Sequence, residues 1–180
     1  LLAENPWSRV LVFVATRYRA DHVARKLAAA GISAASFHGE LAQGTRTRTL
    51  GDFAAGDLRV LVATDLAARG LDVVGLPCVV SYDLPRSPVD HVHRVGRTGR
   101  AGEAGLALSF FDAASAAHLA LIERKNRLRI PREHVEGFAP STAAPPPSTS
   151  PPREQGQGGV KGKRKRKKDK LREAAARRGD

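Results

Sequence analysis

The sequence Val10-Leu11-Val12-Phe13-Val14 (VLVFV) decides the fold of this 180-residue chain. All five residues are apolar, and most are β-branched or aromatic, so the run favours a β-strand. A strand without a polar face has no side to turn toward water, which is typical of a parallel strand covered on both faces. The run therefore predicts a strand of a parallel sheet that lies between two layers of helices.

The rest of the first 130 residues alternates between strand and helix patterns. Apolar residues recur at helical spacing after Thr16, which can cap a helix, and Gly31 and Gly56 stand where two helices should end. This alternation predicts an α/β fold, a parallel sheet with helices on both faces. Strands are expected at residues 10–14, 32–37, 60–63, 77–81 and 106–110, and helices at residues 18–30 and 43–55, at residues 88–96, and after Asp112 as the cap of the last helix.

An arginine-rich stretch follows the fourth of these strands: His93-Arg94-Val95-Gly96-Arg97-Thr98-Gly99-Arg100. It begins inside a short helix that Ser87 can cap and that should end near the first glycine of the stretch. Past that helix, Gly99 lets the backbone turn tightly. Arg97 and Arg100 are three residues apart, so that both can reach one anion.

A solvated basic loop is the alternative interpretation of this stretch. Solvation gives no reason for arginine rather than lysine at every cationic position, or for the glycines between them. Recognition of phosphate by planar guanidinium groups, which donate two parallel hydrogen bonds each, accounts for both features. The stretch therefore predicts a site for a polyphosphate.

Four stretches in this order resemble the motifs of the DEAD-box RNA helicases of superfamily 2. Residues 10–16 resemble motif IV, His38-Gly39 with Gln43 and Arg46 the HG and QxxR elements, residues 63–72 motif V, and residues 93–100 motif VI. In addition, residues 82–85 fit the YDxP element of the family. His91 departs from the pattern, since tyrosine is usual there, as does Ser81, where asparagine is common. The resemblance implies a RecA-like fold, the second of the two such domains in these enzymes.

For the nucleotide, the resemblance implies three residues. Arg97 and Arg100 would be arginine fingers that reach the γ-phosphate of ATP across the cleft between two RecA-like domains. Asp72 would accept hydrogen bonds from the ATP ribose. The cofactor implied is thus ATP.

For RNA, the resemblance implies contacts from Gly39, Arg46, Thr64 and Gly70. Backbone amides beside glycines, a hydroxyl and a guanidinium all bind phosphate oxygens, and such contacts carry no sequence information. We therefore expect binding to the sugar-phosphate backbone of RNA. Thr16 is a weaker candidate, because helix capping already explains it.

The resemblance also implies a partner domain. His93 and Arg94 would tie this domain to the N-terminal RecA-like domain of the same protein. No GxxxxGK[ST] phosphate loop and no DEAD segment occur in the chain, so Mg²⁺ would be held by that other domain. We expect a fragment, beginning at Leu1, that does not hydrolyse ATP alone.

The amino-acid composition of the chain limits the kinds of partner that it can bind and the cellular compartment in which we expect it. The net charge of +12 and the isoelectric point near 10.8 imply attraction to a polyanion, either nucleic acid or an anionic membrane. No apolar run approaches the roughly 18 residues of a membrane span, so we expect no membrane partner. We expect a cytoplasmic protein, or a nuclear or nucleolar one if it is eukaryotic. Six histidines and one cysteine show no ligand spacing, so no metal site is expected, and Cys78 should be an inert core thiol.

The chain divides by composition near residue 130. We expect a folded domain at residues 1–130, and at residues 131–180 a disordered linker and tail, because proline, serine, glycine and then lysine and arginine dominate there. The basic run at residues 161–170 should tether RNA through its phosphates. A solvated tail that only aids solubility is the alternative.

The resemblance therefore implies that the chain is the C-terminal half of an ATP-dependent RNA helicase, which unwinds short duplexes or remodels RNA–protein complexes. Two other functions are alternatives. One is a non-catalytic RNA-binding or annealing module that uses the domain and the tail without ATP. The other is a DNA helicase of the same superfamily, which is disfavoured because those enzymes more often begin motif VI with glutamine than with a histidine such as His93.

Overall fold

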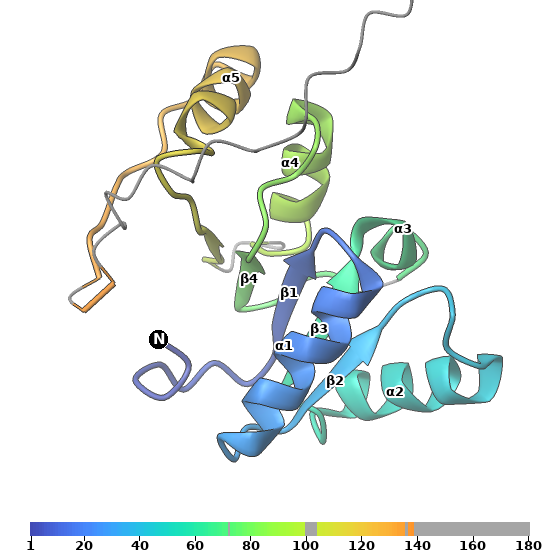
Figure 1. The fold of residues 1–180 in the computed structure, drawn as a ribbon. Helices are drawn as coiled ribbons and strands as arrows, with labels where there is room; N and C mark the ends of the chain where they lie inside the picture. The colour runs from blue at the N-terminus through green and yellow to red at the C-terminus, as the bar shows by residue number, and fades with distance from the viewer. Residues whose placement is uncertain (72, 100–103, 136, 139–180) are drawn as a thin grey trace, which may run out of the picture. The chain divides into compact units, whose positions relative to one another are not determined.

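The computed structural model describes residues 1–71, 73–99, 104–135 and 137–138. Strands and helices alternate along these residues, as the sequence pattern predicts (Figure 1). The elements are β1 (Val10–Val14), α1 (Arg17–Ala29), β2 (Ala34–Phe37), α2 (Gln43–Ala55), β3 (Val60–Thr64), α3 (Asp65–Ala68), β4 (Cys78–Ser81), α4 (Pro88–Val95), β5 (Leu106–Ser109) and α5 (Ala116–Asn126).

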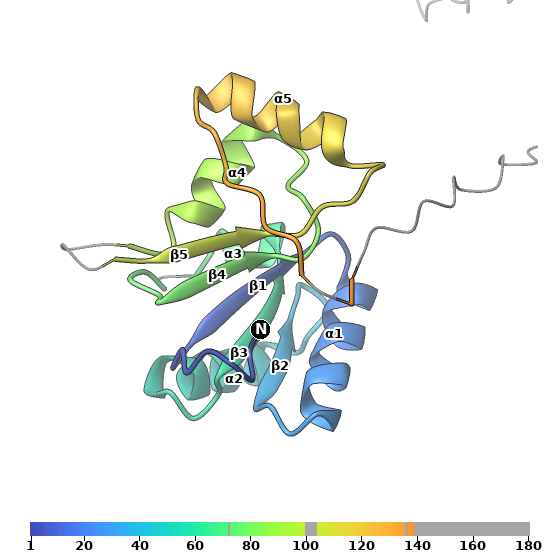
Figure 2. The same ribbon diagram turned by 90° about the vertical axis from the view of Figure 1, so that its left-hand side faces the viewer.

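The five strands form one sheet in the order β2-β3-β1-β4-β5, and every neighbouring pair is parallel (Figure 2). The VLVFV run is the central strand, with Val12 beside Val62 of β3 and Val80 of β4. This confirms the expected parallel sheet. It also explains why that run lacks polar residues, since a central strand has neighbours on both edges as well as on both faces.

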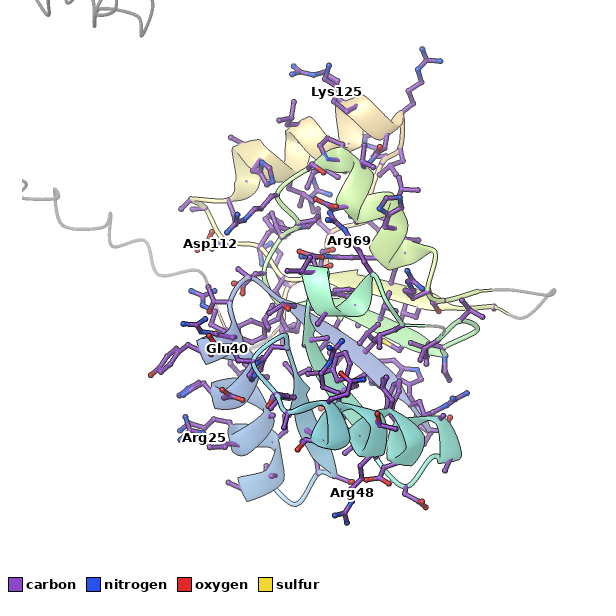
Figure 3. All side chains as sticks on the ribbon, turned by 90° about the vertical axis from the view of Figure 1, so that its right-hand side faces the viewer. Arg25, Glu40, Arg48, Arg69, Asp112 and Lys125 are labelled. Atoms are coloured by element: carbon purple, nitrogen blue, oxygen red, sulfur yellow. The ribbon has the colours of Figure 1, made fainter. Side chains whose placement is uncertain are left out.

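Side chains of β1 alternate between two hydrophobic cores, one on each face of the sheet. Leu11 and Phe13 pack with residues of α2 and α3, whereas Val10, Val12 and Val14 pack with α1. Figure 3 looks onto the face that carries α2, α3 and α4. Helices therefore cover both faces, as expected.

Local chemistry sets the ends of α1 and α2. The Thr16 hydroxyl accepts a hydrogen bond from the Arg19 N–H (3.2 Å), which caps α1 as predicted. Gly31 and Gly56 follow the two helices with φ angles of 77° and 90°. Glycine adopts this left-handed backbone without steric cost, and so it ends both helices.

Helix α4 also begins and ends as predicted. Ser87 Oγ accepts a hydrogen bond from the Asp90 N–H (3.1 Å) and donates one to Asp90 Oδ2 (2.8 Å). Pro88 occupies the first helical turn, where its missing N–H costs nothing. The helix ends before Gly96, and Gly99 makes the expected tight turn with a φ of 61°.

The predicted cap of the last helix is wrong by one turn. Helix α5 has Ser115 as its N-cap residue, not Asp112. Asp112 Oδ1 accepts the Ser115 N–H (2.8 Å) and so closes the turn that leads into the helix. An aspartate can accept a hydrogen bond from the N–H of the residue three positions later both in a turn and at the start of a helix. The sequence pattern is the same in the two cases and so did not distinguish them.

Cys78 is fully buried in β4, as expected for a core thiol. Burial raises the pKa of the thiol to about 11. The reactive thiolate is therefore scarce at neutral pH. The predicted disordered linker and basic tail lie outside the described residues from position 139 onward.

Candidate functional site

The sheet brings the predicted RNA-binding segments to one edge. Thr64 ends β3, Gly39 follows β2, and Thr16 and Asp83 follow β1 and β4. Because all strands are parallel, their carboxyl ends meet at the same edge, where ligands bind in open α/β sheets. Residues separated in the chain by one or more helices thus share this edge.

Arg94 is buried beneath this edge, with only 2% of its surface exposed. Its Nε and Nη2 atoms donate to the two carboxylate oxygens of Asp65, both at 2.8 Å, and Nη1 donates to the Asp83 carbonyl (2.6 Å). The guanidinium lies over the Phe13 ring, 4.9 Å from its centre. Arg94 therefore joins α4 to the ends of β3 and β4. Its predicted contact with another domain stays a prediction.

Arg97 lies next to the loop after α3. Its Nη1 donates to the Leu71 carbonyl (2.9 Å), and its own carbonyl accepts the Leu76 N–H (3.0 Å). Buried Thr98 adds a parallel bridge to Leu76. The segment after α4 is thus held against Leu71 and Leu76. Asp72 and Arg100 lie outside the described residues.

A shallow depression lies between α3 and α4. Arg69 closes one side of it by donating from Nη2 to Asp90 Oδ1 (2.6 Å). Figure 3 shows Arg69 between the two helices. The guanidinium of Arg69 and the hydroxyl of Ser87 hold the pKa of Asp90 below its ordinary value. The depression is lined by Phe13, Asp65, Ala68, Arg69, Asp90, His93, Arg94 and Arg97.

Three arginines line the depression, and two of them form ion pairs with aspartates. Asp65 neutralises Arg94, and Asp90 neutralises Arg69. In the part of the chain that the structure describes, no carboxylate pairs with Arg97, although it lies in the same place. An arginine that is not paired with a carboxylate among the described residues can bind an external anion.

Arg46, a predicted RNA contact, lies on α2 and is half-buried. Its guanidinium lies 5.3 Å from the centre of the Phe37 ring, and Nη1 reaches Gln43 Oε1 at 3.5 Å. Its Nε atom is buried without a partner among the described residues. Gly39 and Gly70 are both exposed, so their backbone is accessible.

His38 and Asp21 support this edge, and sequence reasoning missed their pairing. His38 is buried, with Nε2 3.1 Å from Asp21 Oδ1, and Ser36 Oγ donates to the same oxygen (2.6 Å). The hydrogen bond from Ser36 is the main cause that lowers the pKa of Asp21. These contacts tie the end of β2, just before Gly39, to α1.

Asp65 and Asp83 were also missed as site residues. Asp83 Oδ2 accepts the Ala15 N–H (2.8 Å), and Asp83 pairs with Arg19 as well. The sequence did carry signals for both: Asp65 lies in the stretch that resembles motif V and Asp83 in the YDxP element, and each follows the end of a strand. Within the described ranges, no group of three or more metal-binding side chains occurs. No helix in those ranges has the length and apolar character needed to cross a membrane.

Comparison with known protein families matches residues 1–102 to the helicase conserved C-terminal domain. The chain is 44% identical over 112 residues to the ATP-dependent RNA helicase DDX4 of Mus musculus, which covers 62% of this chain and 16% of DDX4. It is 45% identical over 123 residues to the ATP-dependent RNA helicase RhlB of Pseudomonas aeruginosa, which covers 68% of this chain and 31% of RhlB. The chain thus spans less than a third of either relative.

Solved structures of DEAD-box proteins share the fold. The E. coli protein SrmB, in a crystal structure with the regulator of ribonuclease activity A, aligns with a TM-score of 0.72 at 37% identity, over 81% of this chain and 86% of that one. Dbp5 of S. cerevisiae bound to RNA and ADP BeF3 aligns with a TM-score of 0.60 at 37% identity, over 64% of this chain and 32% of Dbp5.

Proposed function

Because the chain belongs to the DEAD-box RNA helicase family, as a C-terminal RecA-like domain, we propose that it is one half of an ATP-dependent RNA helicase. This half contributes arginines to the ATP site and part of the RNA-binding surface. The other half, an N-terminal RecA-like domain, holds the nucleotide and its Mg²⁺.

One observation carries this proposal: among the arginines around the depression, Arg97 has no carboxylate partner in the described residues. Negative charge spreads over the equatorial oxygens of a γ-phosphoryl group during transfer, and a guanidinium stabilises it without losing a proton. In related phosphoryl-transfer systems such an arginine is worth about 10³ to 10⁵ in rate. Arg97, together with Arg100, serves this purpose.

The loop that follows α3 supplies the ribose contact. Arg97 donates to the carbonyl of Leu71, the residue before Asp72. This bond supports a site in which one loop carries the ribose acceptor and also orients the arginine finger. The chain alone lacks a phosphate loop, so ATP hydrolysis requires both halves.

The RNA surface consists of Gly39, Arg46, Thr64 and Gly70. Two observations support this assignment: Gly39 and Thr64 lie at the carboxyl edge of the sheet, and the backbone at Gly39 and Gly70 is exposed. A solved relative, Dbp5, is bound to RNA. Contacts of this kind reach phosphates rather than bases, so binding is independent of sequence. The activity is separation of short RNA duplexes or remodelling of RNA–protein complexes.

Substitution of Arg97 in the full-length protein tests the proposal. Arg97→Ala should lower RNA-stimulated ATP turnover about a hundredfold or more, because the γ-phosphate loses its guanidinium partner. Affinity for single-stranded RNA, measured by fluorescence anisotropy, should stay nearly unchanged. Arg124→Ala, which removes an exposed arginine of α5, is the matched control. Equal turnover of the Arg97 variant and the wild type would remove the finger assignment.

The binding-only alternative is tested by the same protein. A non-catalytic module would bind and anneal RNA equally well with and without ATP, and the gene upstream of Leu1 would encode no phosphate loop. The DNA-helicase alternative predicts tighter binding to single-stranded DNA than to RNA of the same sequence.

A further inference from the structure

Half-exposed aromatic side chains gather at the carboxyl edge of the sheet. Tyr82 directly follows β4, Phe110 and Phe111 follow β5, and they are 43%, 44% and 41% exposed. Tyr18, in the first turn of α1 after β1, is 70% exposed. The other rings, except Phe138 at the end of the described chain, are buried or half-buried. Aromatic rings that are exposed together in one place are typical of a binding surface.

Tyr82 and Phe110 form a pair within this surface. Their ring centres are 6.0 Å apart and the ring planes meet at 75°, an edge-to-face arrangement. In such a pair the edge of one ring meets one face of the other, so ring faces remain for a further planar group. The Tyr82 N–H donates to the Phe13 carbonyl (3.0 Å). The Phe110 N–H donates to the Ser81 carbonyl (3.0 Å), so the backbone holds both rings in place.

Two arginines beside these rings are already paired with carboxylates. Asp83, the residue after the tyrosine, forms an ion pair with Arg19. Arg132, whose guanidinium lies 5.2 Å from the centre of the Phe111 ring, forms an ion pair with Glu123. A phosphate would have to compete with those carboxylates, whereas a ring face accepts a neutral planar group such as a nucleobase. This end of the edge therefore suits a base better than a phosphate.

The strand order joins the aromatic pair to the proposed RNA surface. Gly39 and Thr64, two proposed phosphate contacts, follow β2 and β3, and the two rings follow β4 and β5 in the same sheet. Figure 2 shows β4 and β5 side by side. Strands β3 and β4 are two strand spacings apart, about 10 Å, so one short oligonucleotide can reach both. The net charge of +12 favours such a polyanion over an apolar peptide.

We propose that Tyr82 and Phe110 form a stacking platform for an unpaired base of the RNA strand whose phosphates bind the same edge. This inference rests on the proposed function and adds a contact to bases. Stacking on an aromatic face accepts every base, so the platform adds affinity without reading sequence. A base held on the protein has left the duplex stack, so the platform favours separated strands. Stacking releases no counterions, so this contact is insensitive to salt.

Binding of single-stranded RNA with and without bases tests the platform. An oligoribonucleotide is compared with versions in which a short block of abasic nucleotides stands at either end or in the middle. Fluorescence anisotropy measures the affinity of the full-length protein for each, with ADP and beryllium fluoride present. The wild type should bind one of the abasic versions about tenfold more weakly than the intact RNA. This ratio should be the same at low and at high salt.

Leucine in place of both rings is the matched substitution, because it keeps an apolar side chain but has no aromatic face. Tyr82→Leu combined with Phe110→Leu should bind intact RNA about tenfold more weakly than the wild type. It should no longer distinguish intact RNA from the abasic versions. Tyr82→Phe, which keeps the ring, should behave like the wild type. Phe138→Leu, at a phenylalanine that is 81% exposed, is the control and should also behave like the wild type.

Two binding results would overturn the inference. One is equal affinity of the wild type for intact and abasic RNA, a measurement that does not depend on how the leucines affect folding. If Arg97→Ala still abolishes ATP turnover in that case, the proposed function stands. The other is a loss of affinity in the leucine variant that is the same for intact and abasic RNA, because the rings then only support the phosphate contacts.

Two further results would also contradict it. A dimer in sedimentation that the leucine substitutions dissociate would show that a second copy of the chain covers the rings. A full-length wild type that binds no RNA would remove both this inference and the proposed function.

Discussion

Arg94 illustrates at the residue scale how a buried charge is accommodated. Its guanidinium makes two hydrogen bonds to Asp65 and one to the Asp83 carbonyl, and it lies over an aromatic ring. A buried charge that is compensated in this way holds its neighbours in one arrangement, since loss of the Asp65 carboxylate would leave the buried guanidinium without a counter-charge. His91, on the same buried face of α4, has no such compensation: its Nδ1 has no partner among the described residues.

His91 makes stability depend on pH. Burial lowers its pKa, and the charge of Arg94 lowers it further. The folded state therefore binds this proton less readily than the unfolded chain, whose histidine titrates near 6.5. Its stabilising effect is complete above about pH 6.5 and is lost as the pH falls through that value toward the lower folded pKa.

We predict that the free energy of unfolding, measured with urea, falls between pH 7.5 and 5 in the wild-type chain, and that His91→Tyr makes this fall smaller. Each unit of pKa difference corresponds to about 1.4 kcal/mol at low pH. His22→Gln, which changes an exposed histidine of α1, should keep the wild-type slope. Identical slopes in the His91 variant and the wild type would contradict the prediction.

At the scale of elements, the segment after α5 is attached to that helix by one carboxylate. Glu123 accepts hydrogen bonds from the Ile130 N–H (2.8 Å) and from both terminal nitrogens of Arg132 (2.8 and 2.9 Å). Arg132 in turn lies over the Phe111 ring. Arg132 and the Ile130 N–H together lower the pKa of Glu123 to about 2.

A lowered carboxylate pKa means that this attachment is present above the ordinary pKa near 4.5 and is lost as the pH falls toward about 2. We predict that Glu123→Gln speeds hydrogen exchange of the Ile130 amide about tenfold at neutral pH, measured by mass spectrometry. Wild-type protein at pH 3 should still be protected. Glu133→Gln should exchange like the wild type, and rapid wild-type exchange at pH 3 would argue against the lowered pKa.

At the scale of the whole molecule, the proposed function implies two kinds of RNA contact, one from the sheet and one from the basic C-terminal segment. The edge residues would bind a few phosphates in defined positions. Residues 161–170 are almost all lysine or arginine and need no defined structure to attract phosphates. The first kind of contact should set geometry, and the second should add affinity that depends on salt.

We predict that deletion of residues 153–180 flattens the dependence of RNA affinity on salt, because the slope falls by about 0.7 for every phosphate that the protein no longer neutralises. Titration of single-stranded RNA by anisotropy at several salt concentrations measures that slope. Replacing the basic run at residues 161–170 with glycine and serine should reproduce the effect, whereas substituting prolines 145–147 should not. An unchanged slope after deletion would show that the tail does not bind RNA.

Several features of this protein could be predicted from its sequence alone, because their sequence signals are local. VLVFV predicted a parallel strand because every position had to be apolar, and Thr16 and Ser87 marked the starts of α1 and α4 because a cap acts on an N–H three residues away. The motif order identified the family. Each of these signals is contained within a few neighbouring residues, so no knowledge of the fold was needed to detect it.

Which charged side chains form ion pairs was decided only by the tertiary structure. Asp65 pairs with Arg94 and Asp90 with Arg69, across 29 and 21 positions. These two ion pairs leave Arg97 without a carboxylate partner in the described part of the chain. Parallel strands bring these segments to one edge, and helix packing buries one face of α4 while its valines stay exposed. Such pairings depend on distances between segments that the chain joins only through its fold, and for that reason residue types and spacing alone did not reveal them.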